Sequence, residues 1–442
     1  MNTSLSGHFS YGKLIRFVLP SVIMMVFTSI YGVVDGYFVS NYAGSSQFAA
    51  INLIMPFLQL LSALGFMIGA GGTALVSFYL GAGDAKRANN TFSLLTYTVI
   101  AFGLIFTVSG ILGLGKVAAL LGATENMLPY CVKYGRIVLA ALVPFMLQNM
   151  FQSFMVAAGK PRLGLFVTVL SGITNMVLDY VLVGLIPLGV TGAALATALS
   201  QCVGGIIPLA YFLLPNKSLL RLGKVTFDGG SIIKACTNGS SEFVTNISMS
   251  VVSMLYNLQL IKYAGENGVS AYGVIMYVSF IFVAVFIGYS MGTAPIIGYN
   301  YGAGNVKELK SLLKKSLIII VVAEISMFIL GEILARPIAQ IYVGYDPELM
   351  KLTLTAFGIY SASYLISGLN IFASAFFTAL SNGRISAIIS FSRTLVFQVL
   401  TVMVLPLILG IKGIWWATFT AELLAAIVSV FYIVRMKEYY NY

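Results

Sequence analysis

Long apolar segments separated by short polar breaks dominate the chain. A membrane helix needs about 20 mostly apolar residues, and the segments between the breaks predict twelve such helices, six in each half of the sequence. The predicted spans are approximately 14–40, 47–80, 91–114, 129–157, 164–185, 189–214, 232–261, 268–300, 315–334, 349–380, 386–409 and 413–435. The pattern therefore predicts an all-α membrane protein.

The two halves carry the same short motifs at a fixed offset. Gly81-Ala82-Gly83 recurs as Gly302-Ala303-Gly304, and Gly189-Val190-Thr191-Gly192 recurs as Gly410-Ile411-Lys412-Gly413, in both cases 221 residues later in a chain of 442. Such a duplication in a membrane chain indicates a transporter whose site lies between the halves. Six spans per half make the two six-helix lobes parallel, related by a pseudo-twofold axis along the membrane normal.

A polar and basic stretch separates the two halves. We therefore expect an N-lobe at 1–214, a cytoplasmic linker at 215–231 and a C-lobe at 232–442.

Composition supports the membrane assignment. Hydrophobic residues make up 59% of the chain, charged residues 9%, and the mean hydropathy is +0.95, so the bilayer must solvate much of the surface. The net charge of +11 does not indicate nucleic acid, because the basic residues lie at the ends of apolar segments. We expect membrane lipids to surround a monomeric chain.

The distribution of basic residues predicts the orientation. If the N-terminus is inside, 17 of the 25 Lys and Arg lie on the inner face, 7 on the outer face, and Arg393 lies within a span. This bias predicts a multi-pass protein of the bacterial inner membrane with both termini in the cytoplasm. We expect no cleavable signal peptide, because the first apolar stretch, 14–42, is too long for a signal core.

Few residues suit enzyme chemistry. Cys131, Cys202 and Cys236 have neither metal-ligand spacing nor a disulfide pattern, and we read them as packing residues. The single histidine, His8, precedes the first span. We therefore expect no enzyme and no cofactor.

Acidic residues inside the spans are the first functional candidates, because charge in hydrocarbon is costly. Asp35 lies 19 residues after Arg16, and Asp179 lies 17 after Arg162. Both helices rise from the cytoplasmic side, so both acids are about 25–28 Å up. Asn175 is one turn before Asp179 on the same helix face.

The sixth span runs inward from the outer face, and Thr197 near its start could lie at the height of the two aspartates. Asn149 on the fourth span is a further candidate for this polar cluster. Two carboxylates with amide and hydroxyl oxygens could hold Na⁺ at Asp35, Asn175, Asp179 and Thr197, or they could share protons. The alternative is structural: each Asp could separately hydrogen-bond to a kinked helix. The residues leave H⁺ and Na⁺ equally open as the coupling ion.

Glu242, Glu324 and Glu422 are the other acids within spans. Glu242 is shallow, and either lines an inner cavity or bonds to nearby backbone. Glu324 and Glu422 could attract a cationic substrate or be satisfied by Ser, Thr or Arg393 between helices.

Aromatic and methionine side chains suit a cavity for flat cations. The candidates are Tyr256, Met276 and Tyr277, and for each of them packing is the alternative.

The chain resembles the multidrug and toxic compound extrusion (MATE) family of the MATE-like flippase superfamily. The resemblance rests on Leu19-Pro20, on Val34-Asp35-Gly36-Tyr37-Phe38-Val39, on the Gly-Ala-Gly turns, on Asn175-Met176-Val177-Leu178-Asp179, and on Gly189-Val190-Thr191-Gly192-Ala193-Ala194. Asn238-Gly239-Ser240-Ser241-Glu242-Phe243 further resembles the MepA-like branch.

This resemblance implies two lobes around a V-shaped cavity and export of drugs in exchange for H⁺ or Na⁺. The family's cation site maps onto Asp35, Asn175, Asp179 and Thr197, with Asn149 nearby. The tenth span has no acid, so the sequence does not predict a second cation site in the C-lobe.

Four functions remain in order of preference. The first is a multidrug efflux antiporter that exports small organic, cationic compounds and contributes to antibiotic resistance. The second is a flippase of a lipid-linked precursor, which Arg393 as the only deeply placed basic residue argues against. A channel or receptor lacks a repeated filter segment, and an intramembrane enzyme lacks a nucleophile motif.

Overall fold

The computed structural model describes residues 5–42 and 45–442, without the side chains of Val33, Ser40, Asn41 and Ser45. The described part is helical, without strands. Its helices are α1 (Tyr11–Tyr42), α2 (Ser45–Gly81), α3 (Ala85–Leu120), α4 (Leu128–Ala140), α5 (Leu142–Ala157), α6 (Pro161–Asp179), η1 (Tyr180–Leu185), α7 (Val190–Leu213), α8 (Gly229–Asn238), α9 (Ser240–Gly302), α10 (Val306–Val343), α11 (Pro347–Tyr360), η2 (Ser361–Ser363), α12 (Tyr364–Ala379), α13 (Gly383–Phe391), η3 (Ser392–Val396), α14 (Phe397–Leu409), α15 (Ile411–Arg435) and α16 (Lys437–Tyr440).

The helices are consistent with the twelve predicted membrane spans. Ten segments of the described part are long and apolar enough to cross a membrane, or eleven if the bent pair α4 and α5 counts as one. One of these segments is α9, with 63 residues, which at 1.5 Å per residue is about three times a bilayer core in length. The chain reverses within α9 at Gly265, where φ is +60° and ψ is −149°, so α9 crosses twice.

The fourth and seventh predicted spans are each divided between two observed helices. The fourth, 129–157, is bent by 58° between α4 and α5. Pro144 lies in the first turn of α5, and proline has no N–H to continue the helical hydrogen bonds. The seventh, predicted from residue 232, begins with the separate helix α8, and the crossing helix starts only at Ser240.

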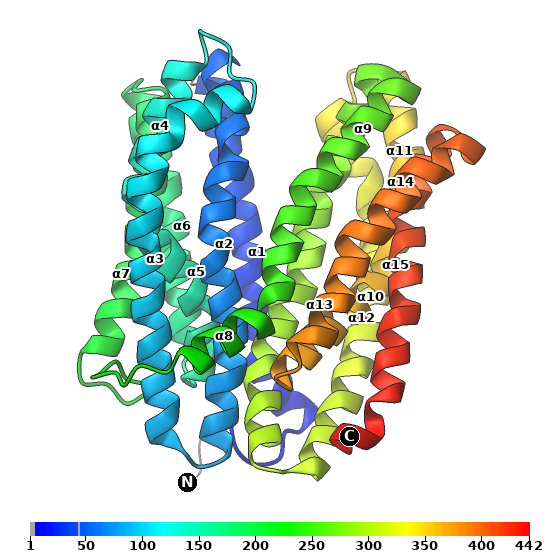
Figure 1. Cartoon of the computed structure of the whole chain (residues 1–442). Coiled ribbons are helices and arrows are strands. Elements are labelled where there is room, and N and C mark those ends of the chain that lie inside the picture. Colours follow the sequence, from blue (N-terminus) through cyan, green and yellow to red (C-terminus); the bar gives the residue numbers. More distant parts are fainter. Residues whose placement is uncertain (1–4, 43–44) are drawn as a thin grey trace.

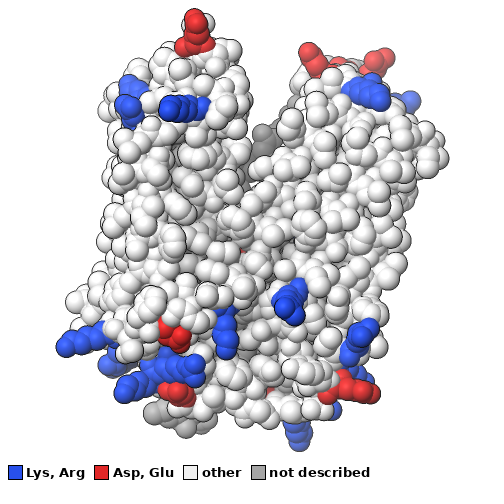
Figure 2. Space-filling model, viewed as in Figure 1, with Lys and Arg blue, Asp and Glu red and all other residues white. Residues whose placement is uncertain are grey.

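The helices form two lobes (Figure 1). Helices α1 to α7 make up one lobe and α9 to α15 the other; the lobes lie close together at the end that carries the C-terminus and diverge toward the opposite end. We call these the termini end and the open end. A hollow separates the lobes at the open end, and charged side chains gather at the two ends of this face with an almost uncharged band between them (Figure 2). Such a band matches the hydrocarbon core.

The sequence repeat is also a structural repeat. Gly83 and Gly304 have φ of +82° and +64°, a region that glycine enters without steric cost. The next residue in each half caps the following helix: Asp84 accepts a hydrogen bond from the Arg87 N–H at 2.9 Å, and Asn305 accepts one from the Glu308 N–H at 3.2 Å. Both turns lie at the termini end (Figure 1).

Candidate functional site

Asp35 and Asp179 meet inside the N-lobe. Asp35 lies in the C-terminal half of α1, and Asp179 is the last residue of α6 and is 0% exposed. The Asp35 carboxyl is within interaction range of the Asp179 carboxyl and of the Asn175 amide. The structure thus brings together three of the residues that helix depth and the family resemblance selected.

The oxygens of this cluster lack hydrogen-bond partners. Among the described residues, no donor reaches Asp35 Oδ1, Asn175 Oδ1, either carboxylate oxygen of Asp179, or Thr197 Oγ1 with hydrogen-bond geometry. Buried carboxylates are strongly disfavoured unless a proton or a cation compensates them. The donor set of carboxylate, amide and hydroxyl oxygens fits either a proton or a hard monovalent cation.

A tyrosine extends the cluster in a way that the sequence did not predict. Tyr134 on α4 is 1% exposed and lies near Thr197, Asp35 and Asp179. No helical spacing relates α4 to α1 or α6, so only the packing of the lobe could identify it. Its hydroxyl gives the site a group that can both donate and accept.

Tyr31 and Gln148 are the second addition. Tyr31 lies one turn before Asp35 on α1 and near both Asp35 and Gln148 on α5. An i, i+4 search from Asp35 would have found Tyr31, whereas Gln148 joins the site only through the packing of α5 against α1 and α6. Among the described residues, Gln148 Oε1 is also without a hydrogen-bond partner.

Each lobe has a π-helical segment that follows or contains an ionisable residue of a membrane span. Asp179 directly precedes η1, and Arg393 lies within η3. A π segment inserts an extra residue into a helical turn and is frequent at functional sites. In the N-lobe it follows the acid cluster, and in the C-lobe it carries the ion pair described below.

Asn149 is hydrogen-bonded to a neighbouring helix. Its amide donates to the Ser62 carbonyl of α2 at 3.4 Å, so it faces the neighbouring helix while Gln148, one residue earlier, faces the cluster. Its place in a cation site stays a prediction without a contact to support it.

The four residues predicted for a substrate cavity lie in different environments. Glu242 is half-buried on α9, and its carboxyl lies within electrostatic range of Arg393. Tyr256 is 1% exposed and bonds to Gln398 at 3.0 Å and Thr418 at 2.8 Å. Met276 packs in the C-lobe core, and Tyr277 is exposed but stacks on Tyr342. Glu242 is thus the member with an acidic group available to a cationic ligand.

The C-lobe satisfies its buried charges internally. Glu422 accepts from Arg393 Nε at 2.9 and 3.0 Å, from Arg393 Nη2 at 2.9 Å, and from Asn370 Nδ2 at 2.8 Å. Asn370 in turn accepts from Ser429 at 2.8 Å. Glu324 accepts from the Leu369 N–H at 2.8 Å. Glu324 and Glu422 therefore have partners among the described residues, whereas Asp35 Oδ1 and both Asp179 oxygens have none.

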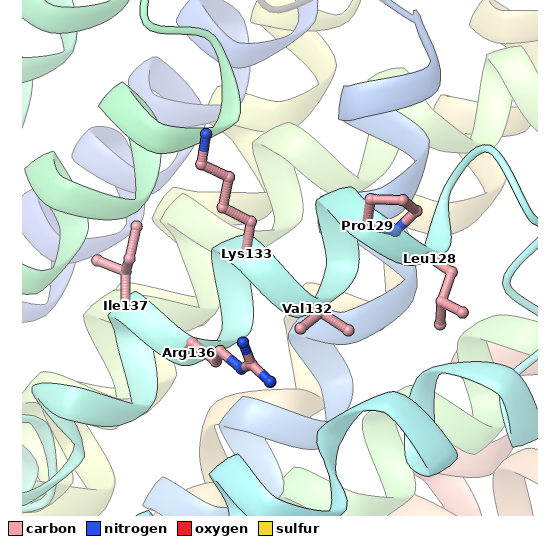
Figure 3. A pocket seen from close by; sticks show the side chains of 6 residues that line it. All are labelled: Leu128, Pro129, Val132, Lys133, Arg136 and Ile137. Carbon is pink, nitrogen blue, oxygen red and sulfur yellow. The ribbon is translucent and has the colours of Figure 1, made fainter.

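One hollow on the described surface lies away from the acid site. It measures about 540 Å³ and is lined by residues of α4 alone: Leu128, Pro129, Val132, Lys133, Arg136 and Ile137 (Figure 3). The described residues also contain no group of three or more His, Cys, Asp or Glu arranged to hold a metal ion. The acid pair with its amide and hydroxyl neighbours is therefore the candidate site.

Comparisons with known proteins agree with this architecture. The sequence profile of the MatE family matches residues 20–181 and 243–404, one match in each lobe. The multidrug export protein MepA of Staphylococcus haemolyticus is 26% identical over 430 residues, which cover 97% of this chain and 94% of that protein.

Solved structures share the fold. An outward-facing conformation of a multidrug resistance MATE family transporter superposes with a TM-score of 0.93 at 22% identity, covering 99% of this chain and 98% of the other. A MOP superfamily transporter from Pyrococcus furiosus superposes with a TM-score of 0.91 at 21% identity and the same coverage. With a family profile that matches both lobes and a fold shared over the full length, this chain belongs to the MatE family of multidrug and toxic compound extrusion transporters.

Proposed function

We propose that this protein is a multidrug efflux antiporter that exports organic cations in exchange for H⁺ or Na⁺. The observation that carries the proposal is the acid pair Asp35 and Asp179: among the described residues, no hydrogen-bond partner reaches buried Asp35 Oδ1 or either carboxylate oxygen of Asp179. A site with unpaired buried carboxylates gains free energy when a cation or proton binds. The name of the MepA relative supports drugs as the exported class.

The proposed transport cycle uses the two lobes as rigid bodies. The N-lobe (1–214) and the C-lobe (232–442) rock about their contact, joined by the linker at 215–231. Binding of the coupling ion to Asp35 and Asp179 from the outside stabilises the state that releases drug, and a ligand can shift such an equilibrium only by its difference in affinity between the states.

The proposed orientation places the termini end in the cytoplasm of a bacterial cell and the open end outside, as the basic residues predict. In this orientation the structure corresponds to the outward-facing state, which is the state named for the similar MATE structure. The protein then acts as a monomer with its central cavity between the lobes, and Glu242 supplies a negative charge for a cationic substrate.

Flipping of a lipid-linked precursor is the alternative. A pyrophosphate head group needs free cationic donors. Arg393, the only deeply placed basic residue of the predicted spans, is bound to Glu422 through both Nε and Nη2. A guanidinium held in this way is not available to a phosphate, which favours the antiporter.

The test is coupled efflux in vesicles. We expect wild-type protein to export ethidium under an imposed pH or Na⁺ gradient, and Asp35→Asn or Asp179→Asn to reduce coupled efflux to background while the protein stays folded. Glu324→Gln is the control, because an amide oxygen at this position still accepts the Leu369 N–H. Wild-type efflux rates in Asp35→Asn would overturn the proposal.

A further inference from the structure

A row of buried polar side chains continues from the acid cluster toward the termini end of the N-lobe. On α6, Asp179, Asn175, Ser171 and Thr168 follow one another at spacings of four, four and three residues, which places them on one helix face. Each is at most 3% exposed. Packing between membrane helices does not require four polar groups in a row. Buried polar groups need hydrogen-bond partners, so we expect these on the facing helices.

Helices α5 and α7 supply those partners. Gln148 Nε2 donates to Ser171 Oγ at 3.4 Å, and Ser171 Oγ donates to the Ser200 carbonyl of α7 at 2.7 Å. Gln152, one turn below Gln148, is 7% exposed, and so is Gln201 on α7. We call Gln148, Gln152, Thr168, Ser171 and Gln201 the polar file.

The polar file has unused hydrogen-bonding capacity. Among the described residues, the amide oxygens of Gln148 and Gln201 have no partner, although both side chains are more than nine-tenths buried. Buried polar atoms of this kind are usually paired with protein or with ordered water. Because no described residue donates to these two oxygens, we infer that water is their partner.

A void lies beside Gln148, one of the two described residues of the polar file with an unpartnered oxygen. Gln148, Gln152, Thr168 and Gly204 line a cavity of about 10 Å³ between α5, α6 and α7. A volume of about 10–15 Å³ holds one water molecule when two or more polar groups surround it. Met155 and Phe151 also line this void and are each 1% exposed, so buried apolar side chains border the file.

Equivalent positions of the two lobes can be compared to ask whether packing alone explains the polar file. At the offset of 221, Gln148, Gln152 and Thr168 correspond to Leu369, Ala373 and Ile389 in the C-lobe. Asp35 and Asp179 correspond to Tyr256 and Leu400. The two lobes share a fold, so packing alone would not favour amides in one and apolar residues in the other. The polar file is present in the lobe that has the acid pair.

Ser171 and Gln201 remain polar in the second half, as Ser392 and Glu422. Glu422 is bound by Arg393, so this position is neutralised within the protein and has no need of water. Three positions are therefore polar in the N-lobe and apolar at the equivalent places of the C-lobe: Gln148, Gln152 and Thr168.

We propose that the polar file is a proton route that connects Asp35 and Asp179 with the cytoplasmic side through the interior of the N-lobe, apart from the cavity between the lobes. A carboxylic proton passes to a water hydrogen-bonded to the file, that water passes another proton onward, and the carboxylate is restored. Opening at Met155 and Phe151 admits the waters that complete the chain.

The width of the file selects the ion. A dehydrated Na⁺ must replace its hydration shell by several protein oxygens at once, and a void for one water between neutral amides cannot provide them. A single water is sufficient for proton transfer. This inference rests on the proposed coupling at Asp35 and Asp179 and specifies H⁺ as the ion that uses the route.

The test replaces the file by what the C-lobe carries at the same positions. We expect Gln148→Leu, and separately Gln152→Ala, to slow pH-driven ethidium efflux at least about tenfold, equivalent to 1.4 kcal/mol in a rate barrier, with an ethidium dissociation constant within about twofold of wild type. Gln398→Leu makes the same chemical change in the C-lobe and is the matched control.

The outcomes separate this route from the proposed function. If Asp35→Asn abolishes coupled efflux and both file variants, folded by size-exclusion chromatography, transport at the wild-type rate, the route is overturned and the coupling site stands. If Asp35→Asn transports normally, the coupling proposal itself fails. Efflux by wild type driven by a Na⁺ gradient at equal pH on both sides would overturn the assignment of the route to H⁺.

Discussion

At the scale of single residues, the two lobes differ in whether their acidic side chains have a partner within the protein. Among the described residues, no donor reaches Asp35 Oδ1 or the two Asp179 carboxylate oxygens, whereas Glu422 is paired with Arg393. The guanidinium is a cation fixed to the protein, so the C-lobe has no charge left for an exchanging ion at this position. This contrast explains why we assign ion coupling to one lobe.

Arg393→Met tests this contrast. We expect it to destabilise the protein by about 3–5 kcal/mol, because it leaves Glu422, which is 2% exposed, as an uncompensated buried charge. The double variant Arg393→Met/Glu422→Gln removes both charges and should recover most of the loss. Thermal unfolding in detergent gives the comparison, and a single variant as stable as wild type would contradict it.

The sequence predicted the two aspartates of the site but not all the residues around them. Asp35 and Asp179 could be placed at one height because helix rise is a fixed length per residue, and the structure brings them together. Tyr134 and Gln148 could not be found in this way, because their contacts join helices whose relative rotation no local pattern specifies. The coupling role of the acids stays a prediction.

At the scale of elements, close helix contacts without intervening side chains hold the lobes together at the termini end. A Cβ atom on Gly81 of α2 would lie 1.9 Å from the Tyr299 carbonyl oxygen of α9, and one on Gly302 would lie 2.0 Å from the Phe78 carbonyl oxygen. These two contacts are related by the repeat, since Phe78 and Tyr299 are also 221 residues apart. Distances below 3.0 Å require the helices to separate.

Gly81→Ala and Gly302→Ala should therefore favour opening at the termini end. We expect faster labelling of Ser77→Cys by a maleimide, in a background without the native cysteines, because Ser77 is 0% exposed and its Cβ is 3.3 Å from a Cβ built on Gly298. Gly273→Ala is the matched control, a helical glycine with no atom within 4 Å of its Cβ. Equal labelling in all variants would refute the expectation.

The apolar pattern predicted the elements well where each helix matches one apolar run. It could not predict the lengths of helices that continue past the apolar part: the predicted span 315–334 lies inside α10, Val306–Val343. Backbone hydrogen bonding continues into the polar interface, where hydropathy gives no signal. It also merged α4 with α5, because a bend leaves the hydropathy of the segment unchanged.

At the scale of the whole molecule, the segment before α1 ties the N-lobe to the C-lobe at the termini end. Leu5 and Phe9 are 0% exposed in a cluster with Leu309 and Leu312 of α10. Glu308 accepts from the Phe9 N–H at 2.9 Å and contacts His8 Nδ1 at 2.8 Å, and Lys315 Nζ donates to the Phe9 carbonyl. Opening between the lobes at this end would strain or break these contacts.

Glu308→Ala should release this segment. We expect hydrogen exchange at the amides of residues 5–10 to rise at least about tenfold, since loss of one hydrogen bond to a charged acceptor costs about 1.5–3 kcal/mol. Glu308→Gln keeps an acceptor for the Phe9 N–H and should exchange at a rate between the two. Exchange in Glu308→Ala that matches wild type would show that the apolar contacts alone hold the segment.

The sequence by itself determined the membrane class, the helical spans, the duplication and the two acids at one height, because hydropathy, repeat offset and helix rise are local properties of the chain. The tertiary structure alone decided which buried oxygens have partners, that Arg393 neutralises Glu422, that glutamines of α5 face the serine and threonine of α6, and that residues 5–10 cross to the other lobe. These depend on the rotation and approach of helices far apart in sequence, which are set by the packing of the whole molecule.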